Sequence, residues 1–446
     1  MSATSSFTPS PTLGLAVTGV LGLTALAMRV WASSVREAVT AGWVAYGRWT
    51  KADEGEYSVA EMNAALSSFS FGPVVSVEEV GELSGGMIGR VRKVLVTFED
   101  GSSLDLVLKS VTKGDASRRH SIVFGGGREG VMYSFVRSPF NKGLPGMEHI
   151  SRMMPVVYAA DGSVRTGGYR IAMECMDGDH DVLVNKVLGD QFRGNTADVN
   201  IDHATSLLAA VAQDVGNLHG LTLGAEEWTH VSWLRGNNWA FGNDKAGWEA
   251  MFAMGRDGWA NGKAAVQALG SDYSQLISFM DASFEDSTWS GVRSALDKLL
   301  GTNTFCLNHG DCHGGNVFLR SPLDDSDLNL AWVDWCVVGL GPLGADLAQF
   351  VISDVHPDVR RKVELSMVAS YHQTLVSTGA VDPESFTEQD AFAAYAGPWG
   401  IGRWVWLLGV LAGFNLPAPM LEYFVQQVDA FVSDHSSYHP VLVHCL

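Results

Sequence analysis

The chain has 446 residues, of which 46% are hydrophobic and 18% are charged. This composition excludes a disordered chain, a collagen-like repeat and a disulfide-dense miniprotein, so we expect a globular protein of two or three domains. Thirty Lys and Arg residues against 49 Asp and Glu residues give a net charge of −19. That charge repels nucleic-acid phosphates, and we therefore expect no nucleic-acid partner. The five scattered cysteines form no C-x-x-C pair and encode neither a disulfide framework nor a four-cysteine zinc site.

The first distinctive segment is the apolar stretch at residues 13–28, which contains no charged side chain. It is slightly shorter than the about 20 residues that a spanning helix requires. Three interpretations stay open: a membrane anchor, a cleaved segment of the organellar transit type, and a helix packed at the periphery. If it spans a membrane, the basic residues that follow place the main body on the cytoplasmic side. Residues 1–56 are predicted to be an extension outside the folded lobes.

A small antiparallel sheet is predicted from residue 57 onward. A capping box formed by Ser58 and Glu61 starts a short helix, and an Asp-Gly turn at residues 99–102 joins two strands as a hairpin. Lys109 ends the third strand, on the face opposite its buried leucines. The strands are expected at residues 74–80, 91–98, 104–109, 154–158 and 169–175.

Beyond residue 178 the pattern changes to helical periodicity, most clearly at residues 201–218. Strand-like character returns only at about residues 306–334. The sequence therefore predicts an α+β fold with two lobes. Residues 57–177 form a small lobe built on an antiparallel sheet, and residues 178–446 form a large, mainly helical lobe.

The densest cluster of reactive side chains lies in that strand-like stretch. Asp311, Asn316 and Asp334 follow one another, and an acidic turn between the last two predicts a hairpin that brings its ends together. In phosphoryl transfer a carboxylate orients the attacking hydroxyl and accepts its proton, while oxygen ligands hold Mg²⁺ against the nucleotide phosphates. Asp311 suits the first task, and Asn316 and Asp334 suit the second.

The motif H-G-D-x-H-x-x-N at residues 309–316, the later Val-Asp-Trp, and the G-L-G-P-L-G-A-D that ends at Asp346 resemble one enzyme superfamily. It is the aminoglycoside phosphotransferase and choline kinase superfamily, and the chain looks most like its ecdysteroid-kinase-like, CHK-domain branch. The resemblance covers about residues 58–435. It implies the bilobal protein-kinase-like fold, ATP and Mg²⁺ as cofactors, and a small hydroxylated molecule as the substrate. Structural support of the catalytic loop is expected from His309, His313 and Asp346.

The same resemblance implies nucleotide-binding roles in the small lobe. The loop containing Ser84, Gly85 and Gly86 would cover the ATP phosphates. Lys109 would contact the α- and β-phosphates and pair with Glu129, whose helix is weakened by roughly 1 kcal/mol for each interior glycine near it. The backbone of the segment from Glu174 to Met176 would bind adenine.

Other interpretations stay open. The weakened helix around Glu129 and the apolar N-terminal segment suggest a catalytically weak or inactive, membrane-tethered nucleotide-binding pseudokinase. A protein kinase is disfavoured, because the segment between Asp334 and Gly341 is too short for a peptide platform. Zinc at the Cys and His residues of the loop lacks a second Cys/His group to complete the site. The acceptor is open among sterol-like alcohols, amino alcohols, aminoglycosides and hydroxyacyl compounds, and no protein partner is predicted. The Trp-rich residues 397–406 are expected to pack in the core, near the position at which members of the resembled superfamily bind substrate.

Overall fold

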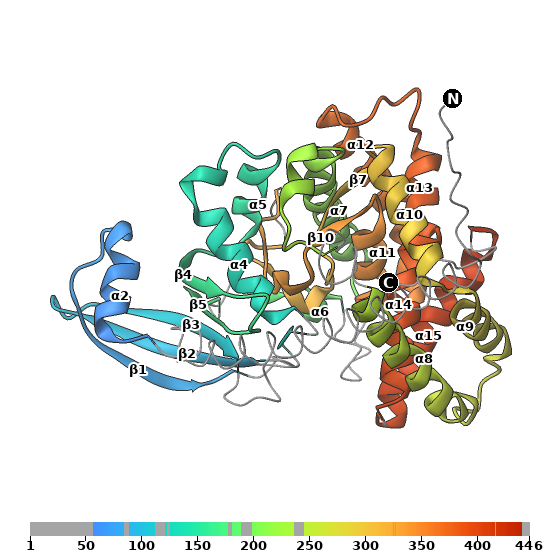
Figure 1. The fold of residues 1–446 in the computed structure, drawn as a ribbon, viewed down its shortest axis with the longest axis horizontal. Helices are drawn as coiled ribbons and strands as arrows, with labels where there is room; N and C mark the ends of the chain where they lie inside the picture. Colours follow the sequence, from blue (N-terminus) through green and yellow to red (C-terminus); the bar gives the residue numbers. More distant parts are fainter. Residues whose placement is uncertain are drawn as a thin grey trace, which may run out of the picture.

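The chain forms two lobes, a small one built on a sheet and a larger one built mainly of helices (Figure 1). This α+β architecture confirms the predicted fold class. The computed structural model describes residues 57–83, 89–111, 121–122, 125–176, 181–188, 199–235, 245–323, 325, 327–414 and 416–438. The apolar segment at residues 13–28 and the predicted phosphate loop at residues 84–86 lie outside these ranges. Within them, the structure contains no helix with the length and apolar character needed to cross a membrane.

The small lobe contains a five-stranded antiparallel sheet with the strand order β1-β2-β3-β5-β4. Its strands are β1 (Val74–Glu82), β2 (Gly89–Phe98), β3 (Ser103–Val111), β4 (Val157–Gly162) and β5 (Tyr169–Glu174). All five predicted strands are present, but β4 begins three residues later than expected. The preceding helix α5 (Met147–Met153) ends just before Pro155, and proline has no N–H to donate to a ladder.

Helix α2 (Val59–Leu66) begins at the predicted capping box, in which the side chains of Ser58 and Glu61 each accept a hydrogen bond from the other's backbone N–H. Its buried residues Met62 and Leu66 join a compact apolar cluster with the strands. This cluster is separate from the main core, which extends from the large lobe to helix α4 (Gly126–Arg137). The small lobe therefore has an apolar core of its own.

Helix α4 packs against β4 with its backbone almost in contact with the strand. A Cβ atom on Gly127 would lie 2.3 Å from the carbonyl oxygen of Ser163, and one on Gly130 would lie 2.3 Å from that of Asp161. Both contacts are far shorter than van der Waals distance. The glycines that lower the helix propensity around Glu129 thus allow the close packing that holds this helix in place.

The large lobe places two short sheets beneath a set of helices. Its strands are β6 (Val182–Leu183), β7 (Phe305–Asn308), β8 (Val317–Leu319), β9 (Leu330–Trp332) and β10 (Gly339–Pro342). Strand β7 pairs with β10, and β8 pairs with both β6 and β9. The helices are α6 (Val184–Val187), α7 (Ile201–Thr222), α8 (Lys245–Gln267), α9 (Ser274–Asp286), α10 (Trp289–Gly301), α11 (Ala345–Asp354), α12 (Pro357–Ser377), α13 (Glu388–Ala396), α14 (Pro398–Ala412) and α15 (Ala418–Asp434).

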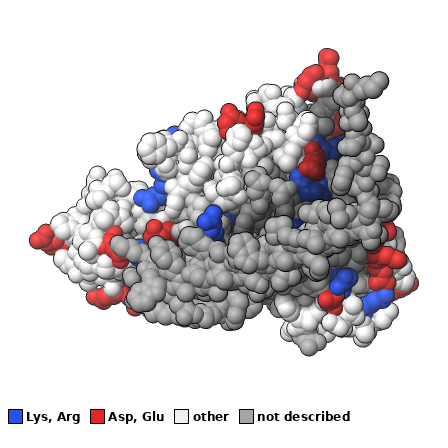
Figure 2. Space-filling model, viewed as in Figure 1, with Lys and Arg blue, Asp and Glu red and all other residues white. Residues whose placement is uncertain are grey.

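Acidic and basic side chains are scattered over the described part of the face drawn in Figure 2, without gathering into one patch of either sign. The described part of this face therefore carries acidic side chains together with several Lys and Arg side chains.

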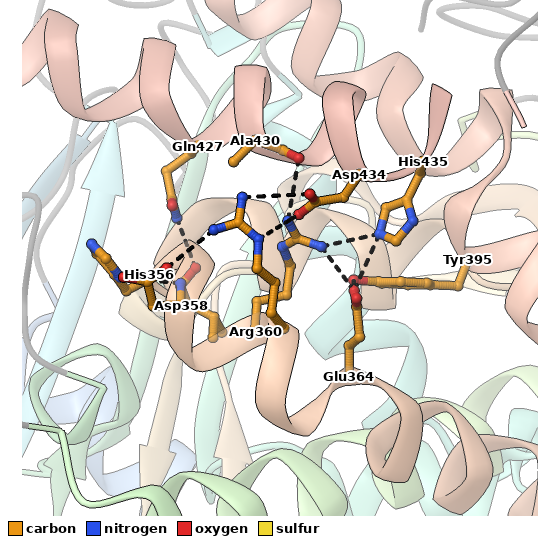
Figure 3. Close-up of polar contacts among 11 residues, drawn as sticks. His356, Asp358, Arg360, Glu364, Tyr395, Gln427, Ala430, Asp434 and His435 are labelled. Carbon is orange, nitrogen blue, oxygen red and sulfur yellow. Dashed lines mark hydrogen bonds and ion pairs between the residues drawn. The ribbon is translucent and has the colours of Figure 1, made fainter. Parts of the chain in front are cut away.

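A buried ionic cluster joins helices α12 and α15 (Figure 3). Arg360 donates to Glu364 Oε2 at 2.9 Å and also pairs with Asp434. The ring nitrogen Nε2 of His435 lies 3.0 Å from Arg360 and 3.2 Å from Glu364, to which Tyr395 adds a hydroxyl hydrogen bond. Burial alone would raise the pKa of Glu364, but the hydrogen bond from His435 and the charge of Arg360 lower it overall. The cluster thus keeps its charges in a site that excludes most water.

Replacing Arg360 with alanine leaves Glu364 and Asp434 without their common cation in a buried site. We expect this change to lower the free energy of unfolding by about 3 kcal/mol. Urea denaturation followed by circular dichroism measures it. Arg361→Ala is the matched control, because the Arg361 side chain is 46% exposed and pairs with the same Asp434. Equal losses in the two variants would contradict a special role for the buried cation.

Replacing Gly130 with alanine tests the close packing of α4. Helix propensity alone predicts that the free energy of unfolding rises by about 1 kcal/mol, whereas the close approach to β4 predicts that it falls by about 1–3 kcal/mol. We expect it to fall. Gly301→Ala in α10 is the control, because a Cβ atom there meets no atom within 4 Å. A stabilised Gly130→Ala protein in urea denaturation would show that the helix does not depend on this contact.

Candidate functional site

The β8–β9 hairpin brings Asn316 and Asp334 to the same end, as the sequence predicted. Val317 pairs with Trp332, and the N–H of Val333 donates to the carbonyl oxygen of Asn316 at 2.9 Å. Asp334 follows immediately, with φ 62° and ψ 57°. This left-handed conformation is uncommon for a residue other than glycine, and such conformations cluster at functional sites.

Asp311 lies on the loop between β7 and β8, beside this hairpin end. The side-chain nitrogen of Asn316 donates to its carbonyl oxygen at 2.9 Å. Its carboxylate oxygen Oδ1 accepts a hydrogen bond from Gln349 at 3.3 Å and lies 3.7 Å from a guanidinium nitrogen of Arg403. The other oxygen lies 3.9 Å from His313 Nε2. The side chain is 25% exposed, so it is oriented by its neighbours and still accessible.

The buried carboxylate of Asp346, at the start of α11, holds the backbone of this loop. It accepts the N–H of His309 at 2.6 Å and the N–H of Gly310 at 2.9 Å. His219 from α7 lies 3.3 Å away on the other side. Burial alone would raise the pKa of Asp346, but the hydrogen bond and charge of His219, together with the Gly310 N–H, lower it overall. Asp346 therefore stays ionised and acts on the loop through its backbone.

The two loop histidines bond backbone groups. His309 is fully buried, and its Nδ1 accepts the N–H of Asp311 at 3.3 Å. Its Nε2 then carries the proton and donates to the carbonyl oxygen of Val333 at 3.0 Å. Burial lowers the pKa of His309, which agrees with this neutral form. His313 accepts the N–H of Gly315 at 3.1 Å. His309 thus ties the Asp311 backbone to the residue before Asp334.

Lys109 connects the sheet to the hairpin. Its Nζ lies 2.8 Å from Glu129 Oε2 on α4 and 3.0 Å from Asp334 Oδ2. Burial would lower the pKa of Lys109, but the charges of Asp334 and Glu129 outweigh it and raise that pKa well above its usual value. Burial raises the pKa of Glu129 to about 7. The expected pair between Lys109 and Glu129 is therefore present, and the same ammonium group also contacts the aspartate assigned to the metal.

Glu174 braces the connection between the lobes. One carboxylate oxygen accepts the N–H of Val156 at 2.7 Å, and the other pairs with Arg320 at 2.9 Å. Arg320 directly follows β8 in the large lobe, whereas Glu174 ends β5 in the small one. Both carboxylate oxygens of Glu174 therefore have partners. If the segment from Glu174 to Met176 binds adenine, its backbone groups would make the contact.

The donor groups fit a magnesium nucleotide. The amide nitrogen of Asn316 donates to the Asp311 carbonyl oxygen, so the amide oxygen would be the atom that binds a metal, and Asp334 would supply a carboxylate oxygen. Mg²⁺ prefers such oxygen ligands, and a lysine ammonium is a common phosphate contact. Ser84, Gly85 and Gly86 lie outside the described residues, so the phosphate loop remains a prediction.

An open pocket lies beside Asp311, with an empty volume of about 640 Å³ when its open solvent is included. Among its charged and polar side chains are those of Arg235, Gln349 and Arg403. They lie on separate segments that only the fold brings together, so the sequence alone does not group them into one site. The pocket is lined by Arg235, Val292, Leu296, Asn308, Gly310, Leu340, Gly341, Pro342, Ala345, Asp346, Gln349, Trp399 and Arg403. Trp404 and Trp406 on the same helix as Arg403 are buried, as expected for packing.

Residues 284–380 match the model of the ecdysteroid kinase-like family. The match contains Asp311, Asn316, Asp334 and Asp346, and it confirms the predicted resemblance over this segment. A search of the curated proteins gives no significant match.

Several solved structures are similar at low sequence identity. An ethanolamine kinase from Plasmodium vivax is 12% identical, with coverage of 81% of this chain and 84% of that one and a TM-score of 0.41. A macrolide 2'-phosphotransferase from Brachybacterium faecium is 14% identical, with coverage of 82% and 97% and a TM-score of 0.37. At such TM-scores the fold assignment rests on the strands and helices described above.

Replacing Asp346 with asparagine tests the support of the loop. Because asparagine offers one acceptor oxygen where two N–H groups need one each, we expect a loss of about 3 kcal/mol in the free energy of unfolding at pH 7. The lowered pKa of Asp346 means that its stabilisation is complete above the unfolded value near pH 4 and is lost as the pH falls further.

Urea denaturation of the wild type and the Asp346→Asn variant between pH 8 and pH 3 checks this. The difference in the free energy of unfolding between the wild type and the variant should be constant down to about pH 5 and shrink below pH 4. Asp325→Asn, at an exposed position between β8 and β9, should show no difference at any pH. A difference between wild type and Asp346→Asn that grows as the pH falls would contradict the stabilising role of the ionised Asp346 carboxylate.

Proposed function

We propose that this chain, with its ecdysteroid kinase-like segment, is a phosphotransferase that moves the γ-phosphate of ATP to a hydroxyl group of a small molecule with the help of Mg²⁺. The main support is the convergence of Asp311, Asn316, Asp334 and Lys109 at one end of the β8–β9 hairpin. These are a carboxylate, two oxygen donors and an ammonium group, which are the parts that phosphoryl transfer requires.

Each side chain has a task that follows from its placement. Asp311, which Gln349 orients and solvent still reaches, would bind the acceptor hydroxyl and take its proton as the oxygen attacks. Asn316 and Asp334 would hold Mg²⁺, which neutralises charge on the phosphates. Lys109 would bind phosphate oxygens while Glu129 keeps its ammonium group in place. Catalysis of this kind depends mainly on positioning and charge.

The alternative of an inactive, membrane-tethered pseudokinase is supported by one fewer observation, because the helix around Glu129 is in place. The glycines near Glu129 do not prevent the pair with Lys109, which is 2.8 Å long. The observation that remains, the apolar segment at residues 13–28, lies outside the described residues. For that segment the three interpretations of a membrane anchor with cytoplasm-facing lobes, a cleaved organellar targeting segment and a peripheral packed helix all stay proposals.

Replacing Asp311 with asparagine should lower the rate of phosphoryl transfer by about 10²–10⁴-fold, because the amide cannot accept the proton. Binding of ATP and Mg²⁺, measured as a thermal shift, should persist. The assay mixes the protein with ATP and a metabolite extract and detects phosphorylated products by their mass. Asp325→Asn serves as a control of equal charge change. Near-normal turnover by the Asp311→Asn variant would refute the role of Asp311.

A further inference from the structure

The pocket beside Asp311 has one apolar side and one basic side. Val292 and Leu296 of α10 line it together with Leu340 and Pro342 of β10 and Trp399 of α14. The basic side is formed by Arg235 and Arg403. Gln349 lines the same pocket and donates to the Asp311 carboxylate, so the pocket leads directly to the carboxylate that would activate the acceptor.

Arg403 places a largely buried guanidinium group next to that carboxylate. Its side chain is 15% exposed, and it lies 3.7 Å from Asp311 Oδ1, which is beyond direct hydrogen-bond distance. Its guanidinium carbon lies 5.0 Å from the ring centre of Trp406, a contact that fixes the side chain through packing. The buried Nε of Arg403 has no hydrogen-bond partner among the residues that the structure describes. A ligand in the pocket therefore meets a positioned cation.

Arg235 adds a second guanidinium group from a different part of the chain. Its backbone bonds Val338 at 3.2 Å and Leu340 at 2.8 Å, which fixes it along β10. A Cβ atom on Gly310 would lie 3.2 Å from Arg235 Nη2, so this group reaches the catalytic loop. Burial, then the charges of Arg403 and Arg128, lower the pKa of Arg235 to about 9. Both arginines line the same pocket.

Among the described residues that line the pocket, the one carboxylate is that of Asp346. Asp346 already accepts the N–H groups of His309 and Gly310 and faces His219. Asp311 lies next to Arg403 but is held by Gln349 and Asn316 as well. The described lining of the pocket thus places two guanidinium groups beside one carboxylate, and the Asp311 carboxylate lies next to Arg403. Guanidinium groups bind carboxylate, phosphate and sulfate through paired, charge-assisted hydrogen bonds.

We propose that this pocket binds the acceptor and that the acceptor carries an anionic group in addition to its hydroxyl group. The inference rests on the proposed phosphotransferase function. The anionic group lies against Arg403 and Arg235, the apolar body lies against α10 and β10, and the hydroxyl group reaches Asp311. An ammonium group at the same position is repelled by both arginines. Of the acceptor classes left open by the sequence, unmodified amino alcohols and aminoglycosides are thereby disfavoured.

Binding of matched compounds tests this proposal without requiring turnover. The probes are straight-chain hydroxy carboxylates and hydroxy amines of equal length, titrated calorimetrically into the full chain. We expect the carboxylates to bind at least about tenfold more tightly than the amines. Arg403→Gln should weaken carboxylate binding by about tenfold to a hundredfold, and Arg403→Lys should restore part of it. Arg361→Gln, on the exposed surface of α12, should leave both unchanged.

The outcomes separate this inference from the proposed function. Equal or tighter binding of the amines, no binding of any probe, or no effect of Arg403→Gln would overturn the anionic acceptor. If other hydroxyl compounds are phosphorylated in that case, the proposed function survives. If the carboxylates bind through Arg403 but neither they nor any other hydroxyl compound is ever phosphorylated, the pocket assignment stands and the phosphotransferase function fails. The thermal shift with ATP and Mg²⁺ verifies that each variant is folded.

Discussion

The conformation of the catalytic loop depends on one buried carboxylate. Asp346 accepts hydrogen bonds from two consecutive backbone N–H groups, those of His309 and Gly310. Gly310 adopts the left-handed conformation needed for this arrangement, with φ +81°, which glycine reaches without strain. The ring of His309 is thereby placed between the Asp311 N–H and the Val333 carbonyl oxygen. A group on α11 that need not touch the substrate thus sets the relative position of the residues on both sides of the hairpin.

Two polar contacts then connect this loop region to the sheet. Lys109 on β3 contacts Asp334, and Glu174 at the end of β5 contacts Arg320. Both contacts join adjacent strands of the small lobe to the two ends of the β8–β9 hairpin. The hairpin therefore connects the sheet of the small lobe to the loop that carries Asp311.

The proximity of Asn316 and Asp334 could be predicted from the sequence, because a short hairpin joins them and the residues of its turn specify that hairpin. The capping box at Ser58 was predictable for the same reason. The pocket was not, because Arg235 and Arg403 are separated by most of the large lobe and meet only after its helices have packed. From helix propensity alone, the glycines of α4 are predicted to weaken this helix, because propensity contains no information about the strand that packs against them.

Those glycines also restrict how the protein can move. With the carbonyl groups of Asp161 and Ser163 directly against Gly130 and Gly127, α4 cannot rotate or slide along β4 without a steric clash. Glu129 therefore stays beside Lys109 whenever the sheet is intact. The close contact between the two backbones therefore favours movement of α4 and β4 together, as one unit of the small lobe.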